Sequence, residues 1–199
     1  MRTLAAGFVL LAAFAAAEPL DRIAVSVGNQ VITESAVILD LRVSAFLDRL
    51  PVDVSAATKR RSAERLADQI LILREATESH LALPASAASL MSDLREQYGP
   101  DYSTALKRYG ITESDIAAQL LAGLIGLTFT DLRFRPAVQI TEEEARAYFG
   151  TLPGAGSFEA NRDRIEELLR RQHTLEALDQ WLITARAAAR VQFREAVFQ

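Results

Sequence analysis

Hydrophobic and polar residues alternate in one short stretch and then give way to helical spacing. Ile23, Val25 and Val27 occupy every second position, which is the pattern of a half-buried strand. Residues 28–30 (Gly-Asn-Gln) favour a tight turn, and residues 31–32 (Val-Ile) can return antiparallel to the first run. Because a two-stranded hairpin alone is marginally stable in water, we expect another element to support it.

Apolar residues at three- and four-residue steps predict helices through most of the remaining chain. Thr33 and Ser55 are suitable N-terminal caps, and Ser86 can cap a third helix after the break at Leu83-Pro84. The expected helices cover residues 33–50, 55–81, 86–98, 101–109, 112–133, 141–149 and 159–188.

The predicted helix over residues 55–81 has a wide apolar stripe. Its centre is formed by Leu66, Ile70 and Leu73, and small or apolar neighbours widen it, namely Ala63, Ala67 and Leu71. The helix over residues 112–133 carries glycines at 123 and 126. They lower its intrinsic helicity, so either neighbours pack closely there or the helix bends.

Two helix starts carry capping motifs. Thr112 and Asp115 form a weak variant of the capping box, and Thr141 with Glu144 matches the full motif. The carboxylates of residues 142–144 also suit the positive end of the helix dipole. A catalytic acidic cluster is the alternative interpretation, but capping accounts for these residues without further assumptions.

Strand-like alternation returns at residues 190–193. We expect this terminal strand to pair with the first strand, so that both ends of the domain close one sheet. The predicted fold is therefore mainly α, a multi-helix domain with a small antiparallel sheet formed by an N-terminal hairpin and a C-terminal strand.

The first residues have the composition of a secretory signal peptide. A positive charge at Arg2 precedes an apolar run over residues 4–16, and small residues follow before Glu18. The run is several residues shorter than the ~20 needed to span a bilayer as a helix. We expect residues 1–17 to be removed after Ala17 and the product to be periplasmic. We expect no second segment to be long and apolar enough to span a membrane, and hence no stable membrane insertion.

The charge balance and the lack of cysteine exclude several classes of function and site. Removal of Arg2 with the leader leaves 21 basic and 26 acidic residues, a formal net charge of −5, which argues against a nucleic-acid partner. The chain has no cysteine, so disulfides, thiolate metal sites and a lipoprotein anchor are all excluded.

No catalytic or cofactor motif is evident in the sequence. The two histidines, His80 and His173, have no partner that the sequence identifies. There is no glycine-flanked nucleophile, no phosphate-binding glycine loop and no zinc-protease spacing. We therefore expect no catalytic residue, no cofactor and no metal. The missing motifs favour a binding protein over an enzyme.

The order of elements resembles that of the SurA family of periplasmic chaperones and of related exported parvulin-type prolyl isomerases. Their N-terminal module is matched by residues 21–37 (DRIAVSVGNQVITESAV), 110–116 (GITESDI) and 138–149 (VQITEEEARAYF). Their closing helix and strand are matched by residues 165–193. The likeness covers nearly all of the chain after the leader, and the order of elements is more diagnostic than any single residue.

One departure from the family limits what the resemblance implies. The family carries parvulin domains after the helix that matches residues 141–149, whereas only residues 150–158 are present here. An independent domain usually needs upward of about 40 residues. The resemblance therefore implies a single SurA-like chaperone domain over residues 18–199. Its N-terminal helical part would be residues 18–149, and its closing helix and strand residues 159–199.

The function implied by this resemblance is that of a chaperone without isomerase activity. Its partners would be unfolded or nascent envelope proteins, chiefly outer-membrane proteins in the family. The alternatives are a peptidyl-prolyl isomerase of the same broad type and an adaptor that docks one fixed partner. A homodimer that exchanges helices through the flexible residues 151–157 also stays open.

A chaperone of this kind needs an apolar groove for varied extended peptides. The candidate peptide-binding residues are apolar or aromatic side chains that the predicted helix faces do not obviously bury: Met91, Tyr98, Tyr102, Tyr109, Phe129 and Phe134.

Overall fold

The computed structural model describes residues 21–152 and 156–199. The predicted signal peptide, its cleavage after Ala17 and part of the predicted linker lie outside the described residues. The helices are α1 (Glu34–Asp48), α2 (Ala56–Glu78), α3 (Ala88–Tyr98), α4 (Tyr102–Tyr109), α5 (Glu113–Arg133), α6 (Glu142–Phe149) and α7 (Phe158–Ala188). The strands are β1 (Ile23–Val27), β2 (Gln30–Thr33) and β3 (Gln192–Phe193), and short 3₁₀ turns are η1 (Gly99–Asp101), η2 (Arg135–Ala137) and η3 (Glu195–Val197). The predicted mainly α fold with a small sheet is confirmed.

The sheet joins the two ends of the described chain. Its strand order is β2-β1-β3, and both pairings are antiparallel. β3 places Phe193 opposite Val25, which confirms the predicted terminal strand. Gly28 adopts a φ of +60°, as a tight hairpin turn requires, and its N–H donates to the Ala189 carbonyl at 2.9 Å. The hairpin is therefore supported by the end of α7 as well as by β3.

Side-chain caps fix most helix starts where the sequence predicts them. The hydroxyls of Thr33 and Ser55 accept from the third backbone N–H beyond them, and Thr112 with Asp115 completes a capping box.

Two predicted caps differ from the structure. The Ser86 hydroxyl accepts from the Ala88 N–H, so Ser86 precedes the first turn of α3 and does not cap it. At α6 only the Thr141 half of the predicted box forms, because the Glu144 carboxylate lies 2.8 Å from His173 Nε2 on α7.

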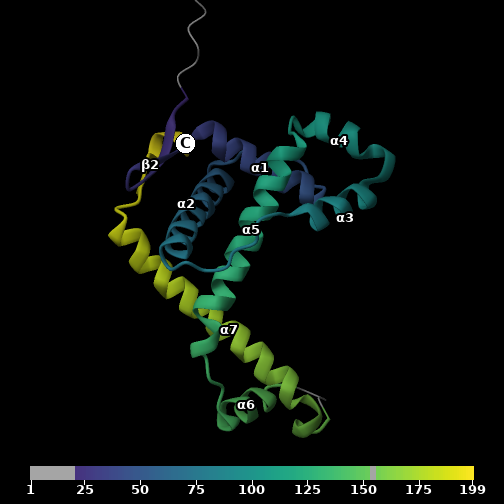
Figure 1. Cartoon of the computed structure of the whole chain (residues 1–199), viewed down its shortest axis with the longest axis vertical. Helices are drawn as coiled ribbons and strands as arrows, with labels where there is room; N and C mark the ends of the chain where they lie inside the picture. The colour runs from purple at the N-terminus through teal and green to yellow at the C-terminus, as the bar shows by residue number, and fades with distance from the viewer. Residues whose placement is uncertain (1–20, 153–155) are drawn as a thin grey trace, which may run out of the picture.

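The helices form a main body and an extension. Figure 1 shows α2 between the sheet and α5, with α3 and α4 at one side of the body, and α7 carrying α6 at its far end. The two largest buried clusters lie between the sheet and α2 and around Phe46 of α1. Two smaller clusters lie around Phe129 of α5 and, joining α6 to α7, around Ala145 and Ile165. α2 packs against the sheet and also contacts α5. The surface between the sheet and α5 is therefore formed by β2, α2 and α5.

Removal of residues 190–199 should strongly destabilise the domain. The deletion takes β3 from the sheet and removes Val197 and Phe198, which are 3% and 7% exposed. Two buried side chains of this size contribute roughly 3 kcal/mol or more to the free energy of unfolding. Urea denaturation should show this loss, whereas deletion of the exposed Gln199 alone should leave the midpoint unchanged. An unchanged midpoint after the longer deletion would contradict the closing role of the C-terminal strand.

Candidate functional site

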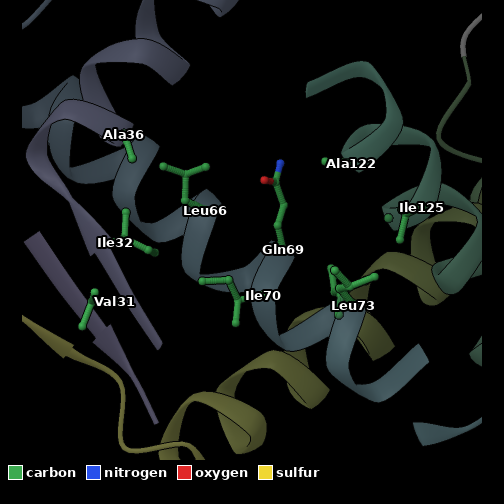
Figure 2. A pocket seen from close by; sticks show the side chains of 11 residues that line it. Val31, Ile32, Ala36, Leu66, Gln69, Ile70, Leu73, Ala122 and Ile125 are labelled. Carbon is green, nitrogen blue, oxygen red and sulfur yellow. The ribbon is translucent and has the colours of Figure 1, made fainter. Parts of the chain in front are cut away.

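An open apolar groove lies between β2, α2 and α5, and we call it the β2–α2–α5 groove. Its volume is about 310 Å³. β2 contributes Val31 and Ile32, and the start of α1 contributes Ala36. The remaining lining comes from α2 (Leu66, Gln69, Ile70, Ile72 and Leu73) and from α5 (Ala122, Ile125 and Gly126). Figure 2 shows the side chains of α2 between those of β2 and those of α5, so α2 forms the floor and the other two elements form walls.

The lining of this groove is neutral. None of its side chains is charged, and among the described residues that line it only Gln69 has a polar side chain. Figure 2 shows the Gln69 amide extending from α2 into the space between Leu66 and Ala122. A charge placed here would lose water without gaining a partner, so the groove favours uncharged, apolar groups.

The groove exists because the apolar surface of α2 is wider than the sheet can cover. Ala63, Ala67 and Leu71 repeat at four-residue steps and are buried against the sheet and its surrounding core, each 0–1% exposed. Leu66 and Leu73 lie on the adjoining strip of the helix, where Leu73 remains 48% exposed. One part of the predicted stripe is therefore core, and the other part is the floor of the groove.

α5 forms a wall although little of its own apolar surface is covered. The segment Glu113–Ala137 is long and apolar enough to cross a membrane by length and composition, with only 17% of its most apolar window buried. The expectation that no second segment reaches this length and apolarity was therefore wrong. α5 nevertheless contacts α1, α2, α3 and α7, so a membrane-spanning position would withdraw it from all four.

A polar network ties together the three helices at one side of the groove. The Asp40 side chain on α1 is 5% exposed, pairs with Arg65 on α2 and accepts from the Ser62 hydroxyl at 2.5 Å. Arg65 also donates to the Ser44 hydroxyl at 3.1 Å, and Gln119 on α5 donates to the same hydroxyl at 2.9 Å. Each of these helices supplies a partner, so the network links α5 to α2 through Ser44 of α1.

None of the six peptide-binding residues predicted from sequence belongs to the lining of this groove, and they fall in two separate clusters. Met91, Tyr102 and Tyr109 are buried around Phe46, and Tyr98 stacks on the Phe46 ring at 4.5 Å between centroids. Burial raises the pKa of the Tyr98 and Tyr102 hydroxyls, which keeps both rings neutral.

The other two predicted residues belong to the cluster between α2, α5 and α7. Phe129 is fully buried and contacts Phe134 and Trp181, with ring centroids at 5.6 and 5.1 Å. Four of the six side chains are thus core residues, and they could meet a peptide only if the core opened. Their peptide-binding role stays a prediction, whereas the side chains that line an open groove include Leu66, Ile70 and Leu73.

The part of the chain that the structure describes contains few side chains of the kinds that commonly act in catalysis or bind metals. His173 has a partner that sequence reasoning missed, the Glu144 carboxylate at 2.8 Å, and this pair joins α6 to α7 on the extension. His80 is exposed and lies just past the end of α2. No group of three or more metal-ligating side chains gathers among residues 21–152 and 156–199.

Comparison with known proteins returns no match from any protein-family model and none from the curated proteins. The resemblance to the SurA family that the sequence suggests therefore stays a prediction.

Replacement of Gly123 or Gly126 by alanine should stabilise the domain. No atom lies within 4 Å of a Cβ added at either position, and a glycine inside a helix costs about 0.5–1 kcal/mol relative to alanine. Thermal or urea unfolding should show a gain of this size for each variant. Gly110→Ala is the control of opposite sign, because Gly110 ends α4 with a φ of +64° and a side chain there is strained. Destabilisation by Gly126→Ala would contradict the open surface at this wall of the groove.

Proposed function

We propose that this chain is an exported chaperone that binds apolar segments of unfolded polypeptides and has no isomerase activity. The observation that carries the proposal is the β2–α2–α5 groove, which is open, apolar and uncharged. A protein that holds many different unfolded chains needs such a surface, since apolar burial is non-directional and does not depend on one exact sequence.

The shape and rim of the groove favour a peptide over a small ligand. Small-molecule sites enclose most of the ligand and place several polar groups around it, whereas this lining supplies the Gln69 amide as its one polar side chain. Apolar surface also continues to the rim, where Val31 and Leu73 are 53% and 48% exposed. A segment of unfolded chain can cover this rim as well as the floor.

The absence of isomerase activity is inferred from the connection between α6 and α7. α6 ends at Phe149 and α7 begins at Phe158, so residues 150–157 stand where the SurA family would carry a parvulin domain. Such a segment is far below the ~40 residues that an independent domain needs.

The place of action is inferred from the leader-like composition of residues 1–17. A periplasmic chaperone would meet its clients as unfolded chains that have just crossed the inner membrane. We therefore propose envelope proteins as the clients, outer-membrane proteins among them.

Introduction of a charge into the groove should weaken client binding. Leu73→Glu places a carboxylate on the floor, where an apolar client would desolvate it, and we expect affinity to fall about tenfold or more. Leu127→Glu is the matched control, because Leu127 is 66% exposed on α5 and lies outside the lining of the groove. Both substitutions are at exposed positions, so unfolding midpoints should stay close to that of the unaltered protein. The measurement is suppression of aggregation of several unrelated unfolded outer-membrane proteins.

Three outcomes would contradict the proposal. If Leu73→Glu and Leu127→Glu lost the suppression of aggregation equally, client binding would not depend on the groove. Clear turnover of proline peptides in a protease-coupled assay would make the chain an isomerase. Tight binding to one folded partner, without suppression of aggregation, would make it an adaptor.

A further inference from the structure

The groove ends on an outer strand of the sheet. The order β2-β1-β3 places β2 at an edge, and β2 forms one wall of the groove through Val31 and Ile32. An edge strand presents backbone N–H and C=O groups that have no partner on their outer side. Gln30 and Val31 are both exposed, so this side of the strand is accessible.

The register of the hairpin identifies the outward-facing backbone groups. Val27 and Gln30 flank a two-residue turn and close it as a hydrogen-bonded pair, so the next pair, Ser26 and Val31, is non-hydrogen-bonded. The other side of β1 agrees with this assignment, because Ala24 and Gly28, each two residues from Ser26, hydrogen-bond to the C-terminal segment that carries β3. The N–H and C=O of Val31 therefore point away from β1, toward the groove. Among the described residues, no backbone group outside the β1–β2 pair is hydrogen-bonded to Val31.

The floor beside β2 is already built to receive another strand. α2 packs under the sheet through Ala63, Ala67 and Leu71, and its adjoining strip continues past β2 as the floor of the groove. A strand added next to β2 would lie over Leu66 and Ile70, as β1 and β2 lie over the buried strip. The neutrality of the lining matches an uncharged segment, because no side chain there could balance a buried charge.

We propose that the groove takes an extended, uncharged apolar segment of a client as a further strand paired with the edge of β2. This inference rests on the proposed function and specifies its mode of binding. The backbone of the client hydrogen-bonds to Val31, and its apolar side chains contact Leu66 and Ile70. All polypeptides carry the same main-chain groups, so recognition through these groups suits a protein with many clients.

Val31→Pro tests this mode directly. Proline removes the outward-facing N–H of Val31 while leaving the hydrogen bonds to β1, and edge strands tolerate proline when its nitrogen faces solvent. Val31→Ala is the matched control, since it trims the side chain and keeps the N–H. The probe is a fluorescein-labelled octapeptide that alternates serine with leucine or valine, and fluorescence anisotropy gives its Kd. We expect Kd to rise about tenfold for the proline variant and much less for the alanine variant.

A second arm leaves the protein unaltered. The same octapeptide N-methylated at alternate residues cannot donate hydrogen bonds from those positions, so the methylation register that faces β2 should raise Kd about as much as Val31→Pro does. Methylation in the other register should have little effect. In Val31→Pro, methylation should add less than it does in the unaltered protein, because both changes remove the same pairing.

The outcomes separate this inference from the proposed function. If Val31→Pro and both methylated peptides bind like their parents while Leu73→Glu loses binding, strand addition is overturned and the groove keeps its proposed role. If neither the octapeptide nor unfolded clients bind the unaltered protein, the proposed function fails and this inference fails with it. Loss of affinity in only one methylation register, together with loss in Val31→Pro, supports strand addition even if the proline variant is somewhat less stable.

Discussion

The burial of α2 against the sheet is the interaction on which the rest of this structure depends. Ala63 and Ala67 let the helix approach the strands closely, and Leu71 completes the contact together with Val25 and Val27 of β1. The sheet by itself is too small to be stable in water, so its strands persist because α2 and the C-terminal residues cover one face. The same packing turns a second apolar strip of α2 away from the sheet. One contact thus both builds the core and leaves the surface that we interpret as functional.

A buried polar network links the helices beside the groove. The buried Asp40 carboxylate would be costly without partners, and Ser62 and Arg65 supply them from α2. Ser44 then links Arg65 to Gln119, which brings α5 into the same network. Hydrogen bonds are directional and apolar contacts are not, so the network adds a geometric constraint to the apolar packing of α5 on α2.

Much of the fold can be predicted from sequence because local signals carry it. Alternating valines and a glycine turn predict the hairpin, and cap residues such as Thr33, Ser55 and Thr112 predict where helices begin. The half-formed cap at Thr141 shows the limit of such signals, because the partner of Glu144 comes from α7, far along the chain.

The candidate site depends on tertiary packing and could be predicted only in part. A periodic stripe shows that Leu66, Ile70 and Leu73 share a face of α2, but it does not show which strip of a wide stripe a neighbour covers. The aromatic residues proposed from sequence show the same limit, because a local pattern does not reveal which of them become buried. Tyr98 and Tyr109 pack around Phe46 because α3 and α4 fold back onto α1. No local sequence pattern predicts this contact.

The pairing of β3 with β1 has a consequence for when the domain can fold. Ser26 pairs with Gln192, so the first strand gains its second neighbour only when almost the whole chain is available. Contacts between residues so distant in sequence form late, since the entropy of closing the intervening loop must be overcome first. The local β1–β2 pairing can form early, but the third strand and the buried side chains of Val197 and Phe198 are added only when the C-terminal end of the chain is available. The domain therefore reaches its full stability only after nearly the whole chain has been synthesised.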